Sequence, residues 1–265
     1  QYTHIGDSLF YEPIIKSFES LNINISVCVH DSLKKYFELA NHKLINKSQI
    51  INNDLIIAPF WIYNHYSKKY KEKTIFLDPT NIQINMPITN YFYSNICKEL
   101  KIRINDDNLF PSKPYFEKYK RFKYSLKNGR KYIIFNDSVD SGVLRITKKM
   151  KYKLLLKAKS YKEKGFDILR LGSQKDKLRF PKKLDIEHID LRGQTDVLDL
   201  FFLISNNQVY GTISFDTAIA HISIMYNKKT FILLRRFTKN HKNHIRKFIM
   251  PSYITENRKE IKYIT

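Results

Sequence analysis

The segment with the clearest chemical signature is residues 214–221, in which Ser-Phe-Asp-Thr-Ala-Ile-Ala-His follows a short apolar run. Asp216 is a candidate N-cap, so a helix beginning there would leave the N–H groups of Thr217, Ala218 and Ile219 without partners inside the helix. His221 would then lie one turn beyond Thr217 on the same face. Free amides, a hydroxyl and an imidazole could together bind a phosphate group. From spacing alone, a capped core helix with one polar side chain near the surface is the alternative.

The elements that would position this segment alternate between strands and helices on both sides of a polar, basic stretch. Before that stretch, we expect strands over residues 24–30, 54–60 and 74–78 and helices over 31–40 and 86–100, with Asp31 or Ser32 capping the first helix. After it, we expect strands over 131–135, 166–171, 186–191, 210–214 and 230–234 and helices over 148–164, 197–206 and 217–226. Regular alternation of this kind predicts parallel sheets.

The polar stretch itself contains Pro111, Pro114 and Asn128-Gly129 and predicts a domain boundary. The fold class expected is α/β, with two Rossmann-like doubly wound domains over residues 1–112 and 131–265 and a linker over 113–130. A cleft between the domains would run along the carboxyl ends of the strands, where such sheets bind ligands. The chain begins inside what looks like the end of a strand, so we expect further residues to precede Gln1.

Composition supports a folded protein. The chain has 265 residues, of which 43% are hydrophobic and 14% aromatic, which excludes wholesale disorder. No apolar run approaches the roughly 18 residues that a membrane-spanning helix needs. Cys28 and Cys97 lie far apart, which argues against a disulfide framework and a zinc site and makes a reducing cytoplasm the default location.

The net charge is strongly positive, with 47 Lys and Arg against 25 Asp and Glu, or +22. One interpretation is an anionic partner, such as nucleic acid, an anionic lipid surface or a phosphate-bearing substrate. The other is a compositional bias toward lysine throughout the chain, because the basic residues are scattered. Both interpretations stay open from the residues alone.

Taken whole, residues 190–234 resemble the carboxyl-terminal half of the ADP-heptose:lipopolysaccharide heptosyltransferase family of glycosyltransferases, which has GT-B architecture. That family has a Leu-x-Gly-x-Thr stretch and a later Ser-x-Asp-Thr-Gly-x-x-His turn. The matching residues here are Leu191, Gly193, Thr195, Ser214, Asp216, Thr217 and His221, with Ala218 at the position of the second motif's glycine. Residues 5–13 are similar to the family's first strand-to-helix turn, a Gly-Asp followed six residues later by Pro.

The resemblance implies a reaction and roles for residues. It implies transfer of a heptose or related sugar, with inversion, from a nucleoside-diphosphate donor to a hydroxyl of a lipopolysaccharide core or other surface glycan. Residues 1–112 would then be the acceptor side and residues 131–265 the nucleotide-sugar domain. Asp7 matches the family's catalytic base; without the resemblance it is a candidate helix cap. The implied donor-binding residues are Ser214, Asp216, Thr217, Ala218, His221, Gly172 and Lys148.

Neither a metal nor a cofactor is expected. The chain has no Asp-x-Asp pair to hold a divalent cation on the diphosphate, and the nearest approach is Asp185-Ile186-Glu187. Helix amides and Lys or Arg would instead stabilise the charge on the leaving group. The family's Lys-x-Trp-Pro is reduced here to Thr147-Lys148-Lys149-Met150, and Lys148 is the first candidate for the cation. A solvated helix face is the alternative, because other lysines surround it.

Two further segments have open interpretations. Trp61 and its aromatic neighbours could stack on an acceptor sugar or belong to the interior. The basic run 235–247 could bind a phosphorylated acceptor or the anionic inner face of the cytoplasmic membrane, or it could be a solvated tail. Two rival functions remain: a basic nucleic-acid-binding protein, indicated by the charge and by Tyr and Phe interleaved with Lys over 115–132, and an inactive glycosyltransferase-like module of a larger synthase. The family resemblance makes nucleic acid the less favoured partner.

Overall fold

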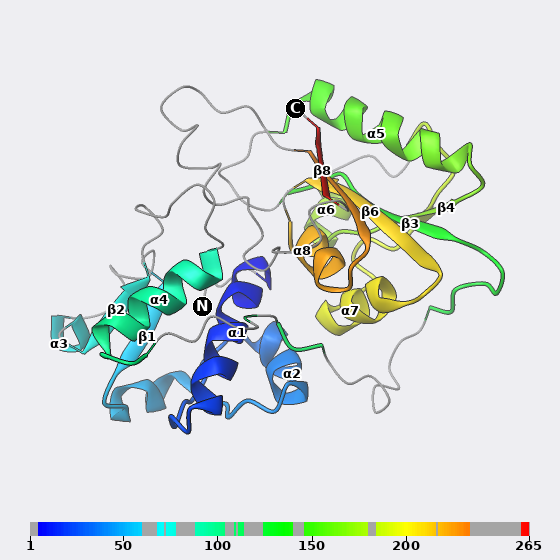
Figure 1. Ribbon diagram of the computed structural model, residues 1–265. Helices are drawn as coiled ribbons and strands as arrows, with labels where there is room; N and C mark the ends of the chain where they lie inside the picture. Colours follow the sequence, from blue (N-terminus) through cyan, green and yellow to red (C-terminus); the bar gives the residue numbers. More distant parts are fainter. Residues whose placement is uncertain are drawn as a thin grey trace. The chain divides into compact units, whose positions relative to one another are not determined.

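The computed structural model describes residues 5–59, 68–71, 73–77, 88–103, 109, 111–113, 124–139, 146–179, 184–215, 217–233 and 261–264. Apart from Ile5 and Gly6, these residues gather into two compact units, one within Asp7–Ser112 and the other within Lys113–Arg236 and Thr255–Thr265. Each unit combines helices with its own parallel sheet, which makes the protein mixed α/β (Figure 1). Residues 114–123 of the expected linker lie outside the described part, and the cleft between domains stays a prediction.

The first unit is mainly helical. Its elements are α1 (Ile5–Ser20), α2 (Asp31–Leu39), the 3-10 helix η1 (Lys47–Asn52), β1 (Ile56–Pro59), α3 (Lys68–Lys71), β2 (Thr74–Leu77) and α4 (Ile88–Glu99). Strands β1 and β2 pair in parallel. Aromatic side chains fill the core between α1 and α4: the rings of Phe18 and Tyr93 lie 5.2 Å apart and those of Tyr11 and Phe92 5.7 Å apart.

Two expectations for the first unit are wrong. Residues 24–30 form no strand and contribute only a parallel bridge between Val27 and Leu44, because the partner segment is a short connection between His42 and η1. Helix α2 is capped by neither Asp31 nor Ser32: the ring Nδ1 of His30 accepts the Ser32 N–H at 3.2 Å.

The start of the chain also differs from expectation. Helix α1 already begins at Ile5, so Asp7 lies inside its first turn and does not precede the helix as a cap. Residues 1–4, where a strand was expected to end, and the side chain of Asp7 lie outside the described part. Pro13 inside α1 lacks an N–H, and the Thr89 hydroxyl of α4 donates a hydrogen bond of 3.0 Å to the carbonyl of Phe10 one turn earlier.

The second unit contains a parallel sheet with the order β5-β4-β3-β6-β7-β8. Its elements are β3 (Tyr132–Asn136), α5 (Lys148–Lys162), β4 (Asp167–Arg170), α6 (Gln174–Arg179), β5 (Ile189–Asp190), α7 (Val197–Ser205), β6 (Val209–Phe215), α8 (Ala218–Met225), β7 (Lys229–Leu233) and β8 (Ile261–Ile264). The chain winds outward from β3 to β5, returns to the other side of β3 at β6 and winds outward again. This order is that of a doubly wound sheet.

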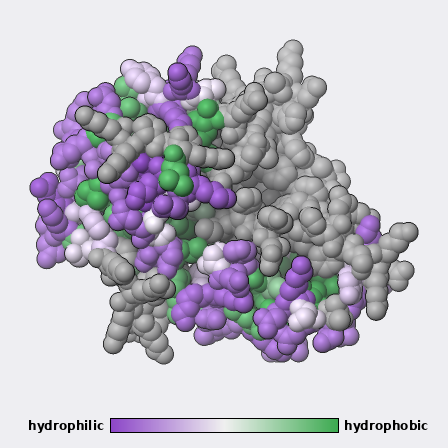
Figure 2. All heavy atoms as spheres, turned by 180° about the vertical axis from the view of Figure 1, so that it is seen from behind, coloured by the Kyte–Doolittle hydropathy of each residue, from purple (hydrophilic) through white to green (hydrophobic). Residues whose placement is uncertain are grey.

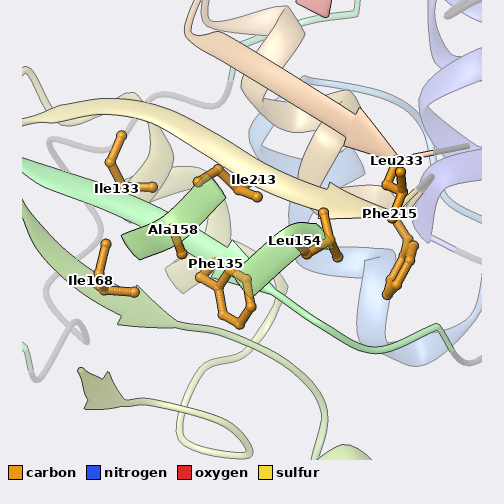
Figure 3. Close-up of a cluster of buried hydrophobic side chains, with 8 residues drawn as sticks. All are labelled: Ile133, Phe135, Leu154, Ala158, Ile168, Ile213, Phe215 and Leu233. Atoms are coloured by element: carbon orange, nitrogen blue, oxygen red, sulfur yellow. The ribbon is translucent and has the colours of Figure 1, made fainter. Parts of the chain in front are cut away.

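Helices cover both faces of this sheet. Alternate residues of β3 and β6 pack with Leu154 and Ala158 of α5 in one apolar cluster (Figure 3). The residues between them face the opposite side, where the hydroxyl of Thr212 in β6 is hydrogen-bonded to that of Ser223 in α8. Helices α5 and α8 therefore lie on opposite faces (Figure 1).

Local sequence explains where these helices begin and end. The Thr147 hydroxyl accepts the Met150 N–H at the start of α5, and Gly165 with φ +84° follows its end. The strand expected over 186–191 shrinks to the two residues of β5, because the His188 ring is hydrogen-bonded to the Ile186 carbonyl, an acceptor that a longer strand would pair. Helix α6 and strand β8 were not expected from the sequence.

Candidate functional site

The topological switch point of the second unit lies between β3 and β6. At its carboxyl end Asn136 of β3 pairs in register with Ser214 of β6, and the connections that follow lead to opposite sides of the sheet. Doubly wound sheets bind ligands in the crevice that this reversal opens. Both side chains are buried, with exposures of 3% and 0%. The sequence had singled out Ser214, but not Asn136.

Helix α8 begins directly beyond β6, with Thr217 as its N-cap. Thr217 has extended backbone angles, and its side chain makes no capping hydrogen bond to the first turn of α8. Its hydroxyl oxygen is buried and has no hydrogen-bond partner in the described part of the chain. The N-terminal amides of α8 and this hydroxyl are therefore available to an anion at the carboxyl edge of the sheet.

The other residues of the 214–221 segment have distinct environments. Ala218 is the first residue of α8, and the buried His221 follows one turn later, where its N–H donates to the Thr217 carbonyl at 3.2 Å. The Ser214 hydroxyl donates to the Phe215 carbonyl at 2.6 Å. Asp216, the expected cap, lies outside the described residues.

The side chain of Asn136, at the end of β3, is hydrogen-bonded to the residue that follows β4. Its side-chain amide nitrogen donates to the Leu171 carbonyl at 3.0 Å and to the Ser138 hydroxyl at 3.1 Å. Its carbonyl oxygen Oδ1 is buried without a hydrogen-bond partner among the described residues. A buried acceptor of this kind is costly unless a ligand or water donates to it, so Asn136 offers an acceptor at the switch point.

A buried ion pair between Asp137 and Arg170 lies next to Asn136. Arg170 ends β4 and is fully buried; its Nε donates to Oδ1 of Asp137 at 3.0 Å and its Nη2 to Oδ2 at 2.7 Å. This bidentate geometry compensates the desolvation of both charges. Because Arg170 lies two residues after Ile168 of the α5-side cluster, its side chain is on the α5 face of the sheet.

A second Arg–Asp pair holds the neighbouring loop. Arg192 is fully buried, its Nε and Nη2 donate to Asp190 at 2.9 and 2.8 Å, and its Nη1 donates to the Asp176 carbonyl at 3.3 Å. Hydrogen bonds from Arg192 lower the pKa of Asp190 to about 2. The Asp176 carboxylate in turn accepts the Ser173 N–H and hydroxyl at 2.7 and 2.8 Å, at the start of α6.

Two glycines allow these loops to approach each other. The Gly193 N–H donates to the Gly172 carbonyl at 2.9 Å. A Cβ at Gly172 would lie 3.0 Å from Asp176 Oδ2, and one at Gly193, where φ is +68°, only 2.0 Å from the Gln174 side chain. The structure thus gives Gly172, which the sequence assigned to the donor, a close-packing role between loops at the carboxyl edge.

The lysines at the start of α5 differ in environment. Lys148 is the first helical residue, and its side chain is exposed. Lys151, one turn later, is partly buried; burial lowers its pKa, and its charge interacts with those of Asp137 and Arg170. Of these two lysines, Lys151 is therefore the one whose charge interacts with the charged groups at the carboxyl edge.

Several sequence candidates fall outside the described residues. These are the side chain of Asp7, the whole of Asp216, Trp61 with its aromatic neighbours, and the basic run 235–247. Within the described residues, no group of three or more His, Cys, Asp or Glu side chains is arranged to hold a metal ion. No helix in that part of the chain is long and apolar enough to cross a membrane.

Sequence reasoning missed five charged or polar residues of this edge: Asn136, Asp137, Lys151, Arg170 and Arg192. One signal was present, since Arg170 stands between leucines in a predicted strand and Arg192 follows directly after another. A charged residue in an otherwise apolar strand of a doubly wound sheet indicates a buried partner. The partner of Arg170 could not be named without knowing that β3 and β4 are neighbours.

Comparison with known proteins identifies the fold. No family model matches the sequence, and no curated protein matches it. Among solved structures, E. coli ADP-heptose lps heptosyltransferase II aligns with 99% of this chain and 88% of its own, at a TM-score of 0.65 and 12% identity. The glycosyl transferase family 9 protein from Veillonella parvula DSM 2008 aligns with 100% of this chain and 84% of its own, at a TM-score of 0.67 and 13% identity. The fold is that of the heptosyltransferase-like glycosyltransferases.

A third structure, E. coli heptosyltransferase WaaC with ADP, aligns with 90% of this chain and 86% of its own, at a TM-score of 0.55 and 10% identity. The likeness therefore extends along nearly the whole chain at very low sequence identity. The resemblance seen in the motifs around Gly193 and Thr217 is confirmed at the level of the fold.

Proposed function

We propose that the protein is a glycosyltransferase that moves a heptose or related sugar from a nucleoside-diphosphate donor to a hydroxyl of a lipopolysaccharide core or other surface glycan. The observation that carries this proposal is the environment of the Thr217 side chain. Thr217 stands at the N-terminus of α8 beside the switch point, with a buried hydroxyl that has no partner in the described residues. The fold likeness to solved heptosyltransferases, one of them solved with ADP, supports a nucleotide as the ligand.

In the proposed donor complex, the first amides of α8 and the Thr217 hydroxyl bind the diphosphate. We assign Asp216, Ala218 and His221 to the same donor site. The free carbonyl oxygen of Asn136 accepts a hydrogen bond from a hydroxyl or amino group of the nucleoside. The amides belong to the helix end, and Thr217 Oγ1 and Asn136 Oδ1 are buried without a hydrogen-bond partner among the described residues.

Departure of the nucleoside diphosphate leaves negative charge on its terminal phosphate. The dipole of α8 and a lysine from the first turns of α5, Lys148 or the partly buried Lys151, stabilise that charge without a metal ion. A cation in a partly buried position acts more strongly than one in water, because the local dielectric constant is lower. The hydrogen bonds between Arg170 and Asp137 hold these two charges in place near Lys151, so in the proposed reaction the pair positions groups and does not contact the substrate.

Chemistry at the acceptor requires a base. In the proposed reaction the acceptor oxygen attacks the anomeric carbon as the bond to the diphosphate breaks, which inverts that carbon, and Asp7 takes the proton of the acceptor hydroxyl. We place the reaction in the cytoplasm, at the inner face of the membrane, where a basic protein with a charge of +22 meets anionic lipid.

The test is calorimetric titration of the whole protein with ADP, UDP and GDP, for the parent and for Thr217→Ala. We expect saturable binding of one nucleotide and a loss of about 1 to 3 kcal/mol in the variant, the value of a hydrogen bond to a charged group. Ser205→Ala is the matched control, because it removes a hydroxyl of the same unit at the end of α7, near the amino end of β6.

Three results would count against the proposal. These are no binding of any nucleoside diphosphate, equal affinity in Thr217→Ala, and an equal loss in both variants. Oligonucleotide binding that falls steeply with salt, without nucleotide binding, would support the nucleic-acid alternative.

A further inference from the structure

The outer face of α5 carries two exposed apolar side chains. The inner face of this helix is used by the core: Leu154 and Ala158 are fully buried, and Met150 packs against the same cluster. Tyr152 and Leu156 point the other way, four residues apart on one face, with exposed fractions of 60% and 46%. Both side chains are therefore available to a partner on this face.

The same helix is strongly basic. Its sequence, KKMKYKLLLKAKSYK, has seven lysines among fifteen residues and no acidic residue. Lys149 lies three residues before Tyr152 and Lys153 three residues before Leu156, so positive charge flanks the apolar pair. Lys159 and Lys162, nearer the C-terminal end, form ion pairs with carboxylates of other segments. Positive charge is therefore concentrated around Tyr152, toward the start of the helix.

The chemistry of the face favours one occupant. An anionic lipid surface offers phosphate groups to the lysines and an acyl boundary to the apolar side chains, which is the arrangement of interfacial helices. A nucleic acid would satisfy the lysines but has no use for an exposed leucine. A second copy of the same face would bring lysine against lysine. On the face drawn in Figure 2, the described residues are mainly hydrophilic, with hydrophobic side chains among polar ones.

We propose that the outer face of α5, centred on Tyr152 and Leu156 and flanked by Lys149 and Lys153, docks the protein onto an anionic membrane surface. Docking places the second unit against the lipid headgroups with the inner face of α5 still packed on the sheet. This proposal deepens the membrane contact of the proposed function by naming the surface that makes it. It can be tested without any sugar transfer, so its failure is distinguishable from failure of the glycosyltransferase proposal.

The experiment is flotation of the whole protein with vesicles of phosphatidylcholine alone and of phosphatidylcholine mixed with phosphatidylglycerol. We expect binding to the anionic vesicles only, weakened by salt. Lys149→Gln should lower the partition coefficient about fivefold, the effect of one basic residue near such a surface. The double variant Tyr152→Ser/Leu156→Ser should lower it about tenfold, because the apolar contribution is lost.

Two control variants separate this surface from general effects. Leu178→Ser removes a single leucine of α6 that is 79% exposed, and Lys98→Gln removes one charge from α4 in the first unit. Both should bind anionic vesicles like the parent. All the substituted side chains are at least partly exposed, so the variants should keep the parent's circular dichroism spectrum and melting temperature.

The proposal is overturned by any of three results: no binding to anionic vesicles, parental binding by the Tyr152/Leu156 double variant, or equal losses in Lys98→Gln and Lys149→Gln. Oligonucleotide binding that Lys149→Gln weakens while vesicle binding is absent would assign the face to nucleic acid instead.

Discussion

A buried cluster around His42 predicts how the stability of the first unit depends on pH. His42 Nε2 contacts Glu12 Oε1 at 2.8 Å, and its Nδ1 contacts Glu19 at 3.0 Å; the side chains of His42 and Glu12 are 1% and 0% exposed. The second oxygen of Glu12 accepts the Ser112 N–H at 2.7 Å. Both ring nitrogens face carboxylates, which favours the charged form of the imidazole.

The pKa of His42 sets the direction of the effect. Burial alone would lower it, but the hydrogen bonds to Glu12 and Glu19 outweigh burial and raise it above the ordinary value of 6.5. A histidine whose pKa is higher in the folded than in the unfolded state contributes stability that is fully present below about pH 6.5 and is lost as the pH rises through the folded-state value. The melting temperature should therefore fall as the pH rises above neutrality.

The size of the expected loss of stability follows from the burial of the Glu12–His42 pair. Glu12→Gln removes a fully buried charge that His42 and Ser112 both contact, and breaking a buried ion pair from one side costs about 3 to 5 kcal/mol. Replacing both partners, as in Glu12→Leu/His42→Leu, removes both buried charges. It leaves without this partner only the Ser112 N–H and the Glu19 carboxylate, whose side chain is 32% exposed, so much of that loss should be recovered. Thermal unfolding over a pH series, followed by circular dichroism, measures both effects.

The matched control is Lys35→Gln, which removes one member of an exposed ion pair with Glu38 on α2 and should change stability by less than about 1 kcal/mol. The reasoning is refuted if Glu12→Gln is as stable as the parent, or if the double variant is no more stable than the single one. A parental pH dependence in Glu12→Leu/His42→Leu would show that other groups cause it.

Three further predictions concern the second unit and the reaction. Arg170→Met should destabilise the protein by about 3 to 5 kcal/mol, and Asp137→Leu in addition should restore much of it; equal stability of the two variants in urea unfolding would contradict a buried ion pair. Gly193→Ala should lower the melting temperature, because φ is positive and a Cβ would collide with Gln174; an unchanged value would contradict that packing. Asp7→Asn should lower kcat about 10²- to 10⁴-fold in a sugar-transfer assay while nucleotide affinity is kept; a parental rate would exclude Asp7 as the base.

Elements with strong periodicity could be predicted closely from sequence. Helix α7, expected over 197–206, is observed as Val197–Ser205, and strand β6, expected over 210–214, as Val209–Phe215. Each buries a continuous apolar pattern, so local preference and tertiary packing agree. Residues 24–30 have a comparable pattern, but among the described residues they pair only through the bridge between Val27 and Leu44. A strand without a longer partner lacks the hydrogen bonds that would stabilise it.

The candidate site likewise has a part that the sequence could predict and a part that it could not. The spacing of Thr217 and His221 is local, and one helical turn suffices to place them together. The partners Asp137 and Arg170 are 33 residues apart and meet because Phe135 and Arg170 are in register across β3 and β4. Register is a property of the assembled sheet, so neither this pair nor the free acceptor of Asn136 could be located from the sequence.

The central claim is that a nucleoside diphosphate binds at the carboxyl edge of the second unit's sheet. A crystal structure of the protein soaked with the nucleotide that binds most tightly tests it most directly. The account predicts the diphosphate within hydrogen-bond distance of the α8 amides and the Thr217 hydroxyl, with a nucleoside group donating to Asn136 Oδ1. A nucleotide bound elsewhere, or an empty switch point at saturating nucleotide, would contradict it.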